Sequence, residues 1–250
     1  MKLFTTLIAT AVSVAAVAIS APAHALVFTQ WNFNNSDLTP NIGNGTASLV
    51  GGTTATFAGG AGSTDLSTPT NMAWITASYP IQGGTFDKIA GVQFASSTAG
   101  YQNIIVSWDQ RNSGTASKYA QFQYSTNGST FVDFGAPSIT GGNGSFLSYS
   151  VDLSSITAVN NNSSFAFRLV SAFDPSTPTL YSGTGGGYTS GGTRRFDMVT
   201  ANGNAIAVPF DTPGGATIPT VGSLVALGAM IKVRKTIASK IANPVTSAVS

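Results

Sequence analysis

Short runs in which apolar and polar residues alternate recur through the middle of this 250-residue chain. A period of two residues is the period of a β-strand with one buried face. In the three clearest runs the apolar residues that share a face are Ile104, Val106 and Trp108; Ala120, Phe122 and Tyr124; and Phe165, Phe167 and Leu169. Between the runs only Leu153–Ile156 suggests a helical turn, so an all-β fold is expected.

Further strands are expected where similar short runs are bounded by Gly, Asn, Ser or Pro, which favour turns. These runs lie at residues 27–33, 47–50, 55–58, 72–79, 89–94, 130–134, 146–151 and 195–200. Asn127-Gly128 separates two of the strands and predicts a tight hairpin, because both residue types tolerate a positive φ. About ten short strands of this kind predict an antiparallel β-sandwich.

The residue types that are missing restrict the chemistry of the chain. It has no Cys, all nine acidic residues are Asp, and the one His is His24, near the N-terminus. After residue 24 the chain therefore has neither an imidazole nor a thiol group. This excludes Ser-His-Asp and Cys-His catalysis, and it excludes zinc sites built from Cys or His. A glycoside hydrolase would need two Asp carboxyls facing one cleft. We therefore expect that the protein is not an enzyme.

The charge of the chain is divided unevenly. Residues 26–210 carry eight Asp and six Lys or Arg, whereas four of the basic residues lie beyond residue 231. The overall formal charge of +2 therefore reflects the C-terminal segment, and no nucleic-acid partner is expected.

Residues 1–25 have the pattern of a signal peptide. A basic start at Lys2 is followed by an apolar run, and the segment ends in Ala23-His24-Ala25. Small residues at these two alanine positions suit cleavage by signal peptidase after Ala25. The alternative is a membrane-spanning helix, but a strand pattern begins directly after the proposed cut. Export is therefore expected, with residues 26–207 as the β-domain.

Residues 208–250 form a linker and a tail. Val208-Pro209-Phe210 begins a Pro- and Gly-rich linker, an apolar segment of 16 residues follows at 216–231, and Lys232, Arg234 and Lys235 complete the pattern. As a helix this segment would rise only about 24 Å, less than the roughly 30 Å of a bilayer core.

The order of linker, apolar segment and basic cluster resembles the sorting tails of PEP-CTERM-type bacterial surface proteins. The VPF motif at 208–210 is most similar to tails found in cyanobacteria. The resemblance implies an exosortase-like peptidase as a partner and a contact with the membrane through a C-terminal hydrophobic helix. The chain lacks Pro-Glu-Pro and continues for ten residues beyond Lys240. An ordinary amphipathic or buried helix is the alternative.

The middle of the chain resembles jelly-roll domains of secreted bacterial proteins. The phrases that carry this resemblance are TQWNFNN at 29–35, GNGTASLVGG at 43–52, the segment 107–131 ending in STNGSTF, the segment 151–170, and GGTRRFDMV at 191–199. Jelly rolls of this kind often hold a structural calcium ion between their first and last strands. The resemblance thus implies Asp197 with Asn34 as calcium ligands; the alternative is a hydrogen bond or an ion pair between Asp197 and Arg194 or Arg195.

Aromatic residues suggest a sugar-stacking surface, since flat aromatic rings pack well on the apolar faces of sugar rings. Trp108 is in phase with Ile104 and Val106, and Trp74 is in phase with Met72 and Thr76, so both are expected in the core. Tyr181 and Tyr188 flank a Gly-rich stretch and are the candidates for a ligand-binding surface; packing is the alternative.

The function expected from these features is non-catalytic binding or adhesion at the cell surface, with extracellular polysaccharide as the ligand. A structural component of the envelope or matrix that binds no small molecule is the alternative.

Overall fold

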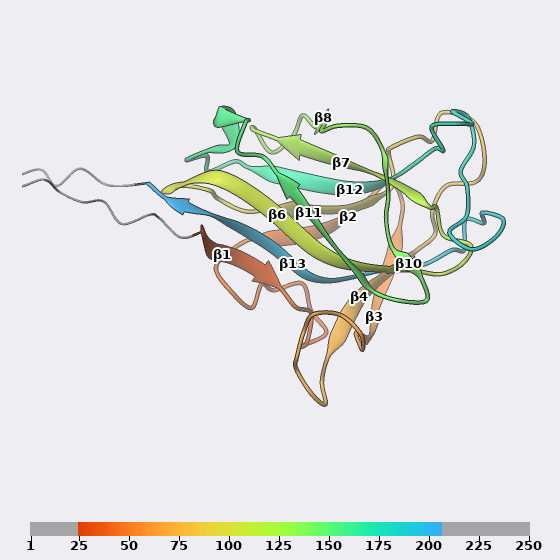
Figure 1. The fold of residues 1–250 in the computed structure, drawn as a ribbon, viewed down its shortest axis with the longest axis horizontal. Coiled ribbons are helices and arrows are strands. Elements are labelled where there is room, and N and C mark those ends of the chain that lie inside the picture. The colour runs from red at the N-terminus through yellow and green to blue at the C-terminus, as the bar shows by residue number, and fades with distance from the viewer. Residues whose placement is uncertain (1–24, 207–250) are drawn as a thin grey trace, which may run out of the picture. The chain divides into compact units, whose positions relative to one another are not determined.

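The computed structural model describes residues 25–206, which form a sandwich of two β-sheets (Figure 1). Within this range the larger sheet has seven strands, namely β1 Ala25–Trp31, β3 Thr54–Gly59, β4 Met72–Ala77, β6 Tyr101–Asn112, β10 Gly142–Asn143, β11 Leu147–Asp152 and β13 Arg194–Ala205. The other sheet of the described range has six strands, namely β2 Thr46–Val50, β5 Gly91–Ala95, β7 Tyr119–Ser125, β8 Val132–Asp133, β9 Ser138–Ile139 and β12 Ala166–Ala172. The all-β sandwich expected from the alternating pattern is thus confirmed.

Strand β13 organises the seven-stranded sheet. Along one side it pairs antiparallel with β6. Along its other side it pairs with β4 as far as Phe196 and with β1 from Val199 onward. Asp197 and Met198 lie between these two partners, and Met198 has a φ of 46°, which marks a bulge at the change of partner.

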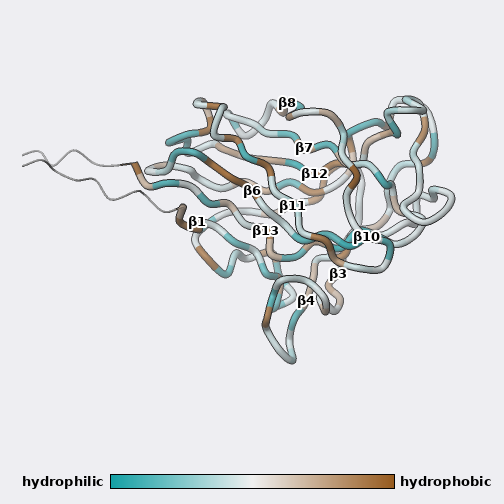
Figure 2. The backbone as a smooth tube through the Cα atoms, in the orientation of Figure 1, coloured by the Kyte–Doolittle hydropathy of each residue, from teal (hydrophilic) through white to brown (hydrophobic). Residues whose placement is uncertain are grey.

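The core lies between the two sheets and is rich in aromatic rings. Phe94 is fully buried; its ring lies 5.2 Å from that of Phe167 and 5.0 Å from that of Trp31. Phe167 in turn stacks on Phe122 at 5.7 Å. Such pairs contribute about 0.5–1.5 kcal/mol each beyond the burial of their surface. Figure 2 shows the matching sequence pattern, with short hydrophobic stretches along β6 and β12.

The predicted alternation is confirmed where it is strongest. Ile104, Val106 and Trp108 of β6 are all buried, as is Trp74 of β4. Phe165, Phe167 and Leu169 share a buried face, and so do Ala120 and Phe122, with the half-buried Tyr124 packed against the same core.

Two local predictions differ from the structure. Gly128 has a positive φ of 74°, but Asn127 does not, and the connection between β7 and β8 is longer than two residues. The Asn127 side chain instead accepts hydrogen bonds from the amides of Ser129 and Thr130, at 3.0 and 2.8 Å. The helical turn expected at Leu153–Ile156 is a turn that leads into a 3-10 helix, η1, at Thr157–Val159.

Long loops gather at the end of the sandwich opposite β1. The Tyr79 amide donates to the carbonyl of Ser190 at 2.9 Å, and the Tyr181 amide donates to Gln82 at 2.7 Å. These bonds hold the segments 78–90 and 173–193 against each other, at the right of Figure 1. A separate loop, residues 60–71 between β3 and β4, projects from the seven-stranded sheet at the bottom of the view.

Candidate functional site

Two carboxylates face each other on the outer surface of the seven-stranded sheet. Asp197 of β13 pairs directly with Asp109 of β6 in the strand register. Both side chains point away from the core, because Phe196 and Trp108 beside them point into it. Both are nonetheless buried, with exposed fractions of 0% and 3%. Like charges placed directly opposite each other destabilise a sheet, so this pair needs compensation.

The loop 60–71 compensates Asp109. The amide and the hydroxyl of Thr64 both donate to Oδ2 of Asp109, at 2.5 and 2.7 Å. The hydroxyl of Ser148 donates to its Oδ1 at 2.6 Å. Both oxygens of Asp109 are therefore satisfied by neutral donors, which stabilise a carboxylate without an ion pair.

Asp197 is not compensated in the same way. Its Oδ1 accepts the Met198 amide at 2.7 Å, but its Oδ2 is buried and has no hydrogen-bond partner. Burial raises the pKa of Asp197 to about 7, and the charges of Asp65 and Asp109 raise it further. The Met198 amide lowers it, as does the hydroxyl of Ser63, which lies near Asp197 without the geometry of a hydrogen bond to Oδ2. A buried oxygen without a partner costs about 1–3 kcal/mol, and more if it is charged.

A second buried oxygen without a partner lies beside it. The Asn71 Nδ2 donates to Ser63 at 3.2 Å and to the Asp65 carbonyl at 2.9 Å, which fixes the orientation of the amide and leaves its Oδ1 unpaired. A Cβ atom on Gly60 would stand 1.9 Å from this Oδ1 and 2.8 Å from Oδ2 of Asp197. Both oxygens therefore lie close to Gly60, and residue 60 must be glycine for them to approach the backbone this closely.

These residues suit two kinds of positive partner. Calcium binds carboxylate, amide and backbone oxygens, and both unpaired oxygens are of this kind. No group of three or more Asp, Glu, His or Cys residues within 25–206 is arranged to hold a metal, so the other ligands would be backbone oxygens or water. The other candidate is a proton on Asp197, which would donate to Oδ1 of Asn71.

Asn34, the predicted second calcium ligand, uses both polar atoms of its side chain in other contacts. Its Nδ2 donates to Asp65 at 2.7 Å, and its Oδ1 accepts the Met72 amide at 2.8 Å. Asn34 thus positions Asp65, and Asn71 supplies the amide oxygen beside Asp197. Sequence reasoning missed Asn71 and Gly60, since a polar loop residue and a glycine carry no periodic signal.

Of the two alternatives for Asp197, the hydrogen bond is observed, from the Met198 amide, and the pairing with an arginine is not. Arg194 is fully buried on the opposite face of β13 and donates to the carbonyls of Ser117 and Tyr119, at 3.0 and 2.8 Å. Arg195 donates to the carbonyl of Gly59 at 2.8 Å. Among the described residues, the one ion pair is Lys88–Asp133.

The tyrosines expected at the surface lie within the loops at the end of the sandwich. Tyr181 is only 3% exposed, and its hydroxyl donates to the carbonyl of Phe86 at 2.5 Å. Tyr188 is half-buried and stacks on Tyr181 with 4.5 Å between the rings. The expectation of an exposed stacking surface was wrong for Tyr181, because its ring and hydroxyl hold the segments 78–90 and 173–193 together.

A row of planar polar side chains crosses the outer surface of the six-stranded sheet. Arg168 of β12 lies between Gln93 of β5 and Gln123 of β7, and Gln123 lies beside Asp133 of β8. We call these four residues the polar row. They point outward because their neighbours along each strand, such as Phe94 and Phe167, point into the core.

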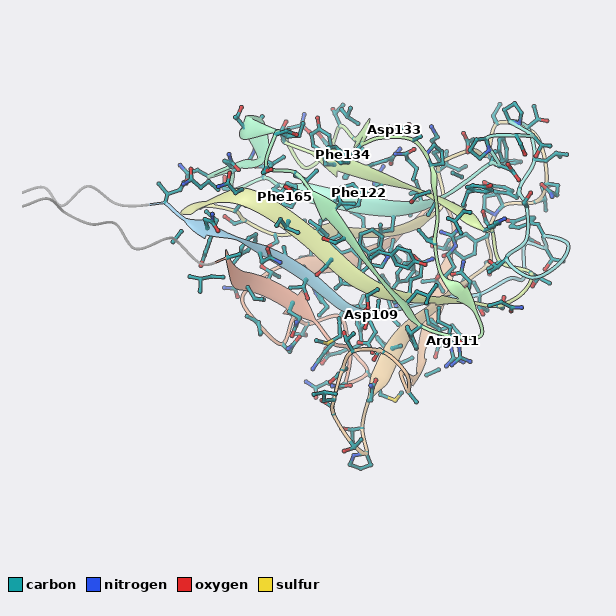
Figure 3. The ribbon with its side chains drawn as sticks, viewed as in Figure 1. Asp109, Arg111, Phe122, Asp133, Phe134 and Phe165 are labelled. Atoms are coloured by element: carbon teal, nitrogen blue, oxygen red, sulfur yellow. The ribbon has the colours of Figure 1, made fainter. Side chains whose placement is uncertain are left out.

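The polar row is held in place by its own contacts. Nε of Arg168 donates to Gln93 at 2.8 Å, and Nε2 of Gln123 donates to Asp133 at 2.9 Å. The Arg168 guanidinium also lies 3.6 Å from the centre of the Phe131 ring. Figure 3 shows Asp133 at the edge of the molecule opposite Asp109 and Arg111, so the polar row and the carboxylate pair are separate.

Several predicted residues lie outside the described range. Ala23 of the signal peptide and Val208, Pro209, Phe210, Lys232, Arg234 and Lys235 of the tail are among them, as are both predicted terminal helices. Ala25 is described, and it pairs with Asn204 at the start of β1. In the described part of the chain, no helix has the length and hydrophobicity needed to cross a bilayer.

Comparison with known proteins gives a likeness of fold. No protein-family model matches the sequence, and no curated protein is significantly similar to it. Among solved structures, the CBM22-1 xylan-binding domain from Paenibacillus barcinonensis is 11% identical, over 75% of this chain and 100% of its own, with a TM-score of 0.45. A cleaved adhesin domain of Lys-gingipain from Porphyromonas gingivalis is 14% identical, over 74% of this chain and 99% of its own, with a TM-score of 0.41. TmCBM61, in complex with β-1,4-galactotriose, is 8% identical, over 68% of this chain and 92% of its own, with a TM-score of 0.37.

Proposed function

We propose that this chain is a non-catalytic glycan-binding module whose ligand lies across the polar row. The observation that carries the proposal is the arrangement of guanidinium, amide and carboxylate groups on neighbouring strands. Strands lie about 4.8 Å apart, so the row presents a polar group at regular intervals along one line. Sugar hydroxyls both donate and accept hydrogen bonds, and planar amide, guanidinium and carboxylate groups pair with them in two directions.

The fixed geometry of the row favours binding. Arg168 is held by Gln93 on one side and by the Phe131 ring below its plane. A side chain that is already ordered loses less entropy when it binds, and each mobile one would cost about 0.5–1.5 kcal/mol. The pKa of Arg168 is lowered by burial, but an arginine keeps its charge, so the row retains a strong donor.

Binding of neutral glycans to the full chain tests this proposal. Xylan and β-1,4-galactotriose are suitable probes in isothermal titration calorimetry. We expect Arg168→Gln and Gln123→Ala each to weaken binding by about tenfold or more, which corresponds to about 1.4 kcal/mol. Lys118→Gln makes the same charge change away from the row and serves as the control.

Two results would contradict the proposal. One is a failure of the wild-type chain to bind any neutral glycan of a broad array. The other is equal binding by the wild-type, Arg168→Gln and Gln123→Ala chains. A chain that binds no glycan yet stays on washed cells would favour the alternative, a structural component of the envelope or matrix.

We also propose that the space between Asp197 and Asn71 holds a structural calcium ion. The two buried oxygens without partners support this, and the charge of Asp65 nearby would attract a cation without being one of its ligands. A bound ion would supply the positive charge that the Asp197–Asp109 pair lacks. Calcium at about 5 mM, above the roughly 10⁻³ M dissociation constant of weak extracellular sites, should raise the melting temperature. Magnesium is the matched control, and equal effects of both ions would count against a calcium site.

We propose, finally, that the chain is exported and displayed outside the cell. The support is the sequence pattern of residues 1–25 and 208–250. Mass spectrometry of the protein isolated from its producer should give Leu26 as the first residue, since cleavage after Ala25 would remove only the first residue of β1. The same spectrum reports whether the tail is processed, and an intact leader on a cytoplasmic chain would refute export.

A further inference from the structure

Two arginines face each other on the outer surface of the seven-stranded sheet. Arg111 of β6 and Arg195 of β13 are direct partners in the strand register. Like charges in this relation repel each other and lower the stability of the sheet. The pKa of Arg195 is lowered, first by burial and then by the charge of Arg111, so each guanidinium lies within the field of the other.

Neither arginine is neutralised by a carboxylate. The one ion pair within residues 25–206 joins Lys88 to Asp133 of β8, which belongs to the other sheet. The nearest acidic residues on the same strands are Asp109 and Asp197, each two residues away and on the same face. The oxygens of Asp109 are occupied by Thr64 and Ser148, and Asp197 is buried near the loop 60–71.

The two arginines line a polar depression of about 210 Å³. Its walls also include Ser113, Asn143 and Thr193. One nitrogen of Arg195 donates to the Gly59 carbonyl, and the Arg111 side chain makes no hydrogen bond within the described part of the chain. Most of the donors of both guanidinium groups are thus free to bind a ligand, and Figure 3 shows Arg111 at the edge of the molecule.

The chemistry of the depression selects an anion. A guanidinium presents its N–H groups as a planar fork that matches a carboxylate or a sulfate ester with two parallel hydrogen bonds. Two such forks on adjacent strands can hold one anionic group between them, and that group would remove their mutual repulsion. The hydroxyls of Ser113 and Thr193 and the amide of Asn143 are suited to neutral hydroxyl groups next to the charge.

We propose that the Arg111–Arg195 depression binds an acidic polysaccharide through a carboxylate or sulfate substituent of one sugar unit. This site is separate from the polar row and goes beyond the function proposed for it. The depression is small and open to solvent, which suits one unit of a longer chain. Because both charges are partly exposed, binding should weaken as the ionic strength rises.

The test compares matched charged and neutral ligands with the full chain. The probes are a galacturonic acid trisaccharide, a sulfated galactose trisaccharide and the neutral galactose trisaccharide. We expect at least one charged trisaccharide to bind about tenfold or more tightly than the neutral one, and the preferred one identifies the substituent. Arg111→Gln and Arg195→Gln should each weaken that binding by about tenfold, and the double variant should abolish it.

The control is the same substitution on the other sheet. Arg168→Gln should leave binding of the charged ligand unchanged and weaken binding of the neutral ligand. Failure of the Arg111–Arg195 proposal and failure of the polar-row proposal therefore give different results. If loss of the Gly59 contact unfolds Arg195→Gln, Arg111→Gln alone remains a valid test, because Arg111 makes no side-chain hydrogen bond to the residues described. Equal affinity for charged and neutral ligands, no binding of either charged ligand, or unchanged binding by Arg111→Gln would overturn the proposal.

Discussion

Replacement of Asp197 by asparagine separates the two possible partners of this carboxylate. Asparagine keeps the shape of the side chain but cannot ionise, and its amide can donate to the unpaired Oδ1 of Asn71. It thus resembles the protonated form of Asp197. The variant should no longer bind calcium at this place, because the charge that would attract the ion is gone.

The expected magnitude follows from the pKa of Asp197. Its ordinary value of 3.8 is raised to about 7 in the folded protein, chiefly by burial. The folded state therefore holds a proton between about pH 4 and pH 7 that the unfolded state has lost. Without a cation, the Asp197 contribution to stability is greatest below pH 4 and is lost as the pH rises through 7. The difference between these two pKa values corresponds to roughly 4 kcal/mol of unfolding free energy.

The assay is urea unfolding of the wild-type chain and of Asp197→Asn at pH 4, 6 and 8. With EDTA, the two should be about equally stable at pH 4, and the variant should be more stable by up to roughly 4 kcal/mol at pH 8. The difference in stability between the two proteins reports Asp197 together with its interactions with the charges of Asp65 and Asp109. Calcium should stabilise the wild-type chain alone.

Two outcomes would refute this reasoning. If Asp197→Asn is less stable than the wild-type chain at pH 8 in EDTA, the buried carboxylate is not under the strain inferred from its unpaired oxygen. If calcium stabilises the variant as much as the wild-type chain, the ion binds elsewhere.

Three further substitutions test other contacts by urea unfolding at pH 7. Gly60→Ala would put a Cβ atom 1.9 Å from Oδ1 of Asn71, so we expect a loss of about 1–3 kcal/mol and no calcium response; a normal response would show that the space lies elsewhere. Phe94→Ala removes a fully buried ring from the core and should cost about 3–5 kcal/mol, and a cost below 1 kcal/mol would contradict the packing described. Tyr181→Phe removes the hydrogen bond to Phe86 and should cost about 0.5–1.5 kcal/mol, whereas no change would mean that this hydroxyl is exposed to water.

The strands were predictable because their signal is local. Ile104, Val106 and Trp108 lie two residues apart, and burial of one face of β6 follows directly from that spacing. The two-residue strands β9 and β10 were not predicted, since a period of two cannot be seen in two residues. The twelve-residue length of β13 was also missed, because the continuation beyond Thr200 depends on pairing with both β6 and β1, which are distant in sequence.

The candidate sites were less predictable because they depend on register. Asp197 was identified by resemblance, but its opposition to Asp109 and the nearness of Asn71 depend on which residues of distant strands and loops meet. The same holds for Arg111 and Arg195, which are 84 positions apart in sequence and face each other only in the folded sheet. Tyr181 was misassigned because an aromatic residue among polar loop residues fits two structures equally well. It can lie exposed on the surface, or it can be buried between two packed loops.

The change of partner along β13 also bears on how the domain would carry a mechanical load. Arg195 and Asp197 lie near the start of this strand, and Ala205 ends it next to the segment that leads to residues 207–250. A pull between a ligand at Arg195 and the C-terminal end would run lengthwise along β13. The backbone hydrogen bonds of β13 to β6 on one side, and to β4 and β1 on the other, would be loaded in shear. They would therefore resist the pull at the same time. A pull on Ala25 away from Ala205 would instead peel β1 from β13 one bond at a time, so resistance to force should depend strongly on the point of attachment.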